Sequence, residues 1–178
     1  MGFWIQASKP RYSGEMDIMD ESLEEAIETL FPLNTECFYI VWNNIHIPLS
    51  YKYDASIMYV DIIRMINTLL STKEGEFRIN WPSNTFHSTW EIKYSEDTIS
   101  IQAAWESVCG KIEHILNTSG GISISKKEFI SEWKEILLVI LKGLKKFYNK
   151  HSFHEDIEKL EGMLVKINES GSLYRNTI

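Results

Sequence analysis

The chain has 178 residues, a net charge of −7 and a hydrophobic fraction of 44%, which suits one domain with a full core. Its longest wholly apolar run, Ile136–Leu141, is far shorter than the roughly 20 residues of a membrane-spanning helix. The acidic balance argues against a nucleic-acid-binding protein, because phosphate contacts need a basic face.

We expect a cytoplasmic protein. The N-terminus shows no basic segment followed by an apolar core, which is the pattern of a secretory signal. Cys37 and Cys109 both lie in apolar, strand-like surroundings, which favours buried thiols in a reducing compartment over a disulfide.

The first elements are a strand and an acidic helix. Gly2–Lys9 is a candidate strand, and a helix is expected to begin at Asp20 or Ser22. Ser22 and Glu25 have the spacing of a capping box, in which each side chain binds the other residue's backbone N–H. Pro32 should end this helix, because proline cannot continue the hydrogen-bond ladder.

A hairpin and a second helix follow. The nearly continuous apolar run Glu36–Trp42 predicts a central strand covered on both faces. Asn43-Asn44 suits a two-residue turn, and residues 45–53 alternate as a second strand. Pro48 places that strand at a sheet edge or a bulge. Asp54 is the expected cap of a helix that runs to Ser71.

Three alternating runs then predict an antiparallel meander, over Glu76–Trp81, Thr85–Tyr94 and Thr98–Val108. Their tryptophans all fall on the apolar phase, which favours core packing against a central helix: Trp81, Trp90 and Trp105. The segment 111–117 is ambiguous between strand and helix.

A long helix is expected from Ile124 to Lys150, with Ser125 and Glu128 as its capping box. Its middle, Ile136–Leu141, is apolar all round and must be covered on both sides. A third capping-box pattern at Ser152 begins a last amphipathic helix, which is the natural cover for one side.

These patterns predict one α+β domain over residues 1–178, rich in strands over 1–118 and helical over 122–168. We expect an antiparallel sheet of about five or six strands, packed against the long central helix with additional covering helices.

Charge is spread unevenly along the chain. Residues 1–121 hold 17 acids and 8 bases, whereas residues 122–178 hold 8 acids and 10 bases. Eight acids and no base lie between Glu15 and Glu36. A patch of one sign attracts and orients a partner of the opposite sign. The candidate partner-binding residues are therefore Asp17, Asp20, Glu21, Glu24, Glu25 and Glu28.

Catalytic and metal-binding signatures are weak. His151 and His154 are three residues apart, but the zinc-protease pattern needs a spacing of four with an intervening Glu. His46 and His87 fall on the polar phase of their strands and could act as bases, yet no nucleophile motif accompanies them. We expect no cofactor and no metal. A basic run late in the long helix suits the helix dipole, or alternatively the acidic helix of another copy: Lys142, Lys145, Lys146 and Lys150.

Two segments resemble a known group of proteins. WEIKYSEDTISIQAAWESVCG at 90–110 and KKEFISEWKEIL at 126–137 are similar in style to immunity proteins of contact-dependent growth inhibition and other polymorphic toxin systems. The resemblance implies a cytosolic protein without catalysis of its own. Such a protein binds a cognate toxin domain, often an RNase or DNase, and occludes its active site or substrate groove. No motif matches residue by residue, so no site residue is transferred.

Two other functions remain open at this point. The first is a small enzyme whose pocket lies between the sheet and the 54–71 helix, with His46 or His87 as base. The second is a non-enzymatic oligomerising or adaptor protein.

Overall fold

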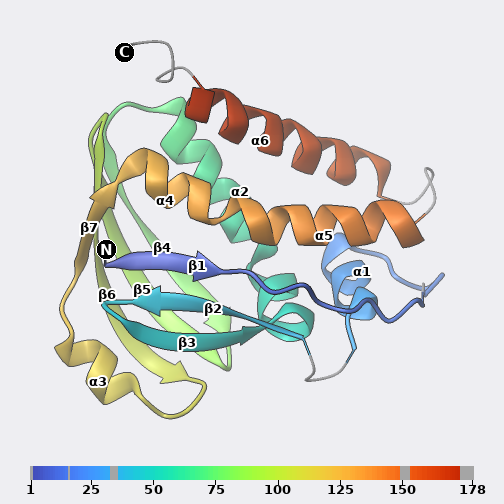
Figure 1. Ribbon diagram of the computed structural model, residues 1–178, viewed down its shortest axis with the longest axis horizontal. Helices are drawn as coiled ribbons and strands as arrows, with labels where there is room; N and C mark the ends of the chain where they lie inside the picture. Colours follow the sequence, from blue (N-terminus) through green and yellow to red (C-terminus); the bar gives the residue numbers. More distant parts are fainter. Residues whose placement is uncertain (1, 16, 33–35, 149–152, 173–178) are drawn as a thin grey trace.

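Two antiparallel sheets face a layer of helices (Figure 1). The structure, a computed structural model, describes residues 2–15, 17–32, 36–148 and 153–172. None of its described helices is long and apolar enough to cross a membrane. The elements in chain order are β1 (Phe3–Gln6), α1 (Leu23–Leu30), β2 (Cys37–Trp42), β3 (Ile45–Ser50), the π-helix η1 (Tyr51–Ala55), α2 (Ser56–Ser71), β4 (Gly75–Ser83), β5 (Phe86–Tyr94), β6 (Thr98–Val108), α3 (Glu113–Thr118), β7 (Ile122–Ser125), α4 (Lys126–Glu132), α5 (Lys134–Phe147) and α6 (His154–Ser172).

The smaller sheet has the order β1-β2-β3, with β2 in the centre as predicted. The predicted cover on both faces is incomplete, because the Tyr39 side chain is exposed. Asn43 and Asn44 adopt φ of 47° and 67°, which confirms the two-residue turn between β2 and β3. Pro48 lies on the edge strand β3, where its missing N–H costs no ladder bond. The predicted strand over 45–53 is wrong beyond Ser50, because the chain turns there into η1.

Ser50, and not Asp54, caps the helical segment formed by η1 and α2. The Ser50 hydroxyl accepts two backbone N–H groups of η1. The Asp54 carboxylate accepts the Ser50 N–H at 2.6 Å and also the hydroxyls of Ser83 and Thr85. Asp54 is buried, so this network fixes the start of the helix to the turn between β4 and β5.

The larger sheet has the order β4-β5-β6-β7. Its first three strands are the predicted meander, with Trp81 and Trp90 fully buried and Trp105 4% exposed. β7 adds a fourth strand through the pairing of Ile124 with Ile99. Ile124 was expected at the start of the long helix, so this strand was not predicted.

Two parts of the predicted architecture are wrong. The seven strands of the described residues form two sheets of three and four, and not one sheet of five or six. The long helix is broken into α4 and α5 at Trp133, whose fully buried ring stacks on Trp81 with centroids 5.9 Å apart. No proline or glycine marks this break, so periodicity alone could not reveal it.

Helices close the other faces of the core. α6 packs on α5, α4 and α2, as expected of a cover, and buries Leu160, Met163, Leu164 and Ile167. α1 packs on the C-terminal part of α5, where Gly143 allows a close approach. A Cβ at Gly143 would lie 2.4 Å from Leu30 Cδ2 and 2.6 Å from Tyr12 Cε1.

We predict opposite effects for the same substitution in two helical glycines. Gly143→Ala should destabilise the fold by about 1–2 kcal/mol, because overpacking against buried Leu30 outweighs the gain in helix propensity. Gly162→Ala in α6 has nothing within 4 Å and should stabilise by up to about 1 kcal/mol. Urea unfolding measures both, and a Gly143→Ala protein as stable as the wild type would contradict the close packing.

Candidate partner-binding surface

The six predicted acidic residues lie on and before α1 (Figure 1). The capping box at Ser22 and Glu25 is confirmed, and the helix begins at Leu23. Asp17, Asp20 and Glu21 therefore belong to the turn that leads into the helix. We call the six residues together the acidic surface: Asp17, Asp20, Glu21, Glu24, Glu25 and Glu28.

Three of these carboxylates have structural roles. Asp17 Oδ1 accepts the Met19 N–H at 2.9 Å, which closes the turn before the helix. Asp20 accepts the hydroxyls of Thr29 and Tyr148. Glu25 accepts the N–H of Glu21 at 2.7 Å and completes the capping box. These three residues shape the surface.

The other three are available for a partner. In the described part of the chain, the side chains of Glu21, Glu24 and Glu28 have no hydrogen-bond or ion-pair partner. Glu21 and Glu24 are exposed and Glu28 is half-buried. Glu24 and Glu28 are four residues apart on the helix, where like charges repel by a few tenths of a kcal/mol. Their charge therefore costs a little stability and is not neutralised internally.

Two large apolar side chains stand beside these acids. Ile18 is 86% exposed and Met19 is 72% exposed, and they are the most exposed of the large hydrophobic residues that the structure describes. Sequence reasoning missed both. The available signal was a pair of apolar residues placed between Asp17 and Asp20, upstream of a capping box and therefore outside the buried helix stripe.

An open groove of about 570 Å³ adjoins this turn. It is lined by Ser13, Glu15, Asp17, Ile18, Thr29, Phe31, Pro32 and Lys52. Lys52 is its cation, and its Nζ donates to the backbone carbonyl of Glu28 at 2.9 Å. A cation suits this position, because it meets a carbonyl near the C-terminal end of α1. The groove therefore has mixed polar, apolar and acidic walls.

Two tyrosines fix the acidic surface to α5. The Tyr12 hydroxyl donates to the Val139 carbonyl at 2.8 Å. The buried Tyr148 hydroxyl donates to Asp20 and also meets the Ala26 carbonyl at 3.3 Å. Burial, and next the hydrogen bond to Asp20, raise the pKa of Tyr148 well above its usual range. These hydrogen bonds tie the turn before α1 to the end of α5.

The histidines lie elsewhere. His46 is exposed on β3, and its ring centroid is 6.2 Å from that of Trp4. His87 Nδ1 lies 3.4 Å from a Glu106 carboxylate oxygen on the exposed side of the larger sheet. His154 pairs with Glu158 on α6 at 3.2 Å, and His151 lies outside the described residues. No metal-binding group of His, Cys, Asp and Glu occurs within the described ranges.

The basic run of α5 is partly engaged within the molecule. Lys145 pairs with Glu161 of α6, and Lys146 Nζ lies 4.8 Å from the centroid of the Phe147 ring. Lys142 is exposed, and Lys150 lies outside the described residues.

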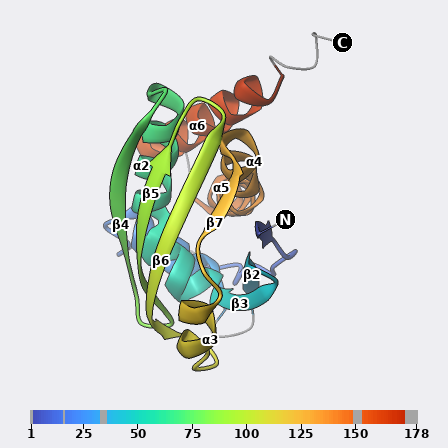
Figure 2. The same cartoon turned by 90° about the vertical axis from the view of Figure 1, so that its left-hand side faces the viewer.

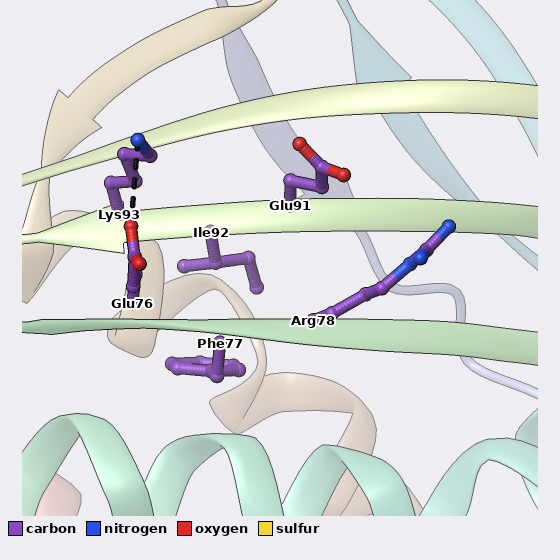
Figure 3. A pocket seen from close by; sticks show the side chains of 6 residues that line it. All are labelled: Glu76, Phe77, Arg78, Glu91, Ile92 and Lys93. Atoms are coloured by element: carbon purple, nitrogen blue, oxygen red, sulfur yellow. Dashed lines mark ion pairs between the residues drawn. The ribbon is translucent and has the colours of Figure 1, made fainter.

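Other grooves on the surface are less suited to bind a partner that carries charge of one sign. One of about 470 Å³ on the larger sheet is lined by Glu76, Phe77, Arg78, Glu91, Ile92 and Lys93, with Glu76 bridged to Lys93 (Figure 3). The groove between α2 and β4 has neither His46 nor His87 in its lining.

A third groove, of about 400 Å³, includes both cysteines and buried Asp54 in its lining. The two thiols are free. Burial of Cys109 was wrongly predicted, since this residue is exposed, and Cys37 is half-buried. Burial, and next the charge of Asp54, raise the pKa of the Cys37 thiol, which makes it a poor nucleophile.

Comparison with protein-family models, curated proteins and solved structures finds no match to this chain.

We predict that Tyr148→Phe loosens the acidic surface. Loss of the hydroxyl should cost about 1–2 kcal/mol, because Asp20 loses a buried donor. The raised pKa of Tyr148 means that the wild-type advantage is complete below pH ~10 and declines above it, since the unfolded tyrosine ionises there and the folded one does not. Urea unfolding from pH 7 to 11 measures this, with Tyr39→Phe as control, because the Tyr39 side chain is exposed.

Proposed function

We propose that this protein is an immunity protein, which binds a cognate toxin domain through the acidic surface and blocks its active site or substrate groove. The observation that carries the proposal is the arrangement on and before α1. Glu21, Glu24 and Glu28 are left without an internal partner among the described residues, and exposed Ile18 and Met19 stand beside them on a turn held by Asp17 and Asp20.

The proposed mechanism is steric and electrostatic. A nuclease binds nucleic acid in a groove lined with Lys and Arg, whose charges meet phosphates. Carboxylates presented on a rigid helix can occupy the same groove and exclude the substrate. Complementary charge accelerates the encounter between the two proteins, and buried apolar contacts then slow their separation.

The turn is suited to this role because it is preorganised. Asp17 binds the Met19 N–H, and Asp20 is tied to Thr29 and Tyr148, so little conformational entropy is lost on binding. Co-purification with the product of the gene directly upstream is the first test. The proposal expects a stable complex of the two proteins and loss of the toxin's activity in it; absence of both would refute it.

We predict that Glu21→Lys, Glu24→Lys and Glu28→Lys together slow association with that partner by about tenfold or more at low salt. The difference should shrink above about 0.1 M salt, where the Debye length falls below about 10 Å. Glu25 is left unchanged because it caps α1. Stopped-flow or surface-plasmon kinetics give the association rate, and circular dichroism checks the fold.

The matched control changes the net charge equally at distant exposed positions: Glu74→Lys, Glu91→Lys and Glu169→Lys. An equal slowing by the control set would show that total charge, and not this surface, steers the partner.

A second prediction concerns the apolar pair. Ile18→Ala with Met19→Ala should raise the dissociation rate by about tenfold or more and leave the association rate nearly unchanged, because buried contacts act after the encounter. Ile115→Ala on α3, also an exposed aliphatic residue, serves as control. Unaltered dissociation in the double variant would place Ile18 and Met19 outside the interface.

A further inference from the structure

The larger sheet has a free edge at β4. This strand ends the order β4-β5-β6-β7, and its nine residues pair with β5 on one side. No other strand among the described residues lies against its outer side, and Figure 2 shows β4 as the outermost strand. A free edge presents unpaired backbone N–H and C=O groups, which are a template for another strand.

Pro82 indicates which backbone N–H and C=O groups of β4 face the free edge. Proline is tolerated in a strand where its nitrogen points to the free edge, and Pro82 pairs with His87 on the other side. Backbone direction alternates along a strand, so the N–H and C=O groups of Glu76, Arg78 and Asn80 also face the free edge. All three side chains are exposed.

A groove of about 340 Å³ runs beside this edge, between α2 and β4. Four consecutive residues of β4 and four of α2 line it: Phe77, Arg78, Ile79 and Asn80, with Asp61, Arg64, Met65 and Thr68. Val60, one helical turn before Arg64, is 50% exposed. The edge therefore combines unpaired backbone with neighbouring apolar surface.

Arg78 has no ion pair within the described residues. Its cross-strand neighbour on β5 is Glu91, but the pair is not closed in the structure, whereas neighbouring Glu76 is bridged to Lys93 at 3.4 Å (Figure 3). The strand thus carries opposite charges at positions two apart, on either side of Phe77.

We propose that β4 pairs antiparallel with β4 of a second copy, centred on Phe77, to form a two-fold dimer with a continuous sheet. In this register Glu76 faces the partner's Arg78, and Arg78 faces Glu76 of the partner subunit. These are the residues whose backbone groups point outward, so each such pair also exchanges two backbone hydrogen bonds.

Charge selects this register over its neighbours. Centring on Arg78 would place two arginines opposite each other, which is destabilising. Centring on Ile79 would place Glu76 opposite Pro82, which has no N–H to donate. Centring on Phe77 keeps Pro82 outside the central pairs. The larger sheet and α1 lie at opposite sides of the view in Figure 1.

The test uses the protein alone. Sedimentation equilibrium of the wild type, from about 1 to 200 μM, should show a monomer–dimer equilibrium. Arg78→Glu places glutamates opposite each other across the axis, and Glu76→Arg places arginines there. Each variant by itself should dissociate about tenfold more readily. Glu106→Arg, an exposed position on β6 two strands inward, should leave the dimer unchanged, and circular dichroism checks folding.

Mixing the two variants supplies the decisive measurement. In an equal mixture of Arg78→Glu and Glu76→Arg proteins, every cross-axis pair is again opposite in charge, so the heterodimer should form with near wild-type affinity. A wild type that stays monomeric throughout the range would overturn the proposal. So would a dimer that resists both single substitutions, or a mixture that remains as dissociated as its components.

Discussion

Packing of indole rings between the two sheets is the contact on which the rest of the molecule depends. Trp42 of the smaller sheet lies 5.4 Å from Trp90 and 5.2 Å from Trp105 of the larger sheet, measured between ring centroids. Trp133 joins the cluster where α4 meets α5. Fully buried rings of this size contribute about 3–5 kcal/mol each. Within the described ranges no strand of one sheet pairs with a strand of the other, so side-chain packing in this cluster is a principal link between them.

The acidic surface takes its position from contacts with α5 as well as from local hydrogen bonds to Asp17 and Glu25. Gly143 lets Leu30 approach the helix, and Tyr148 binds Asp20 across 128 residues of sequence. Three of the six carboxylates hold the turn, and the other three are not used internally by the described chain. This division explains how a short segment can be both rigid and highly charged, which are the two properties that a steering surface needs.

Sequence patterns predicted well those local elements whose signal lies within a single cap, turn or alternating run. The capping box at Ser22, the Asn43-Asn44 turn and the three-stranded meander all have their signals within a few residues. The acidic residues were also evident from sequence. The exposure of Ile18 and Met19 was missed, although both residues precede the capping box and so fall outside the buried stripe of the helix.

The sequence by itself determined an α+β chain with a net negative charge, together with the capping box at Ser22 and the Asn43-Asn44 turn, because those features depend on neighbouring residues. Only the tertiary structure decided that seven strands divide into two sheets, that Trp133 interrupts the predicted long helix and that Asp54 ties a helix start to a distant turn. Each of these depends on contacts between residues far apart in the chain, and such contacts leave no periodic trace in the segments that make them.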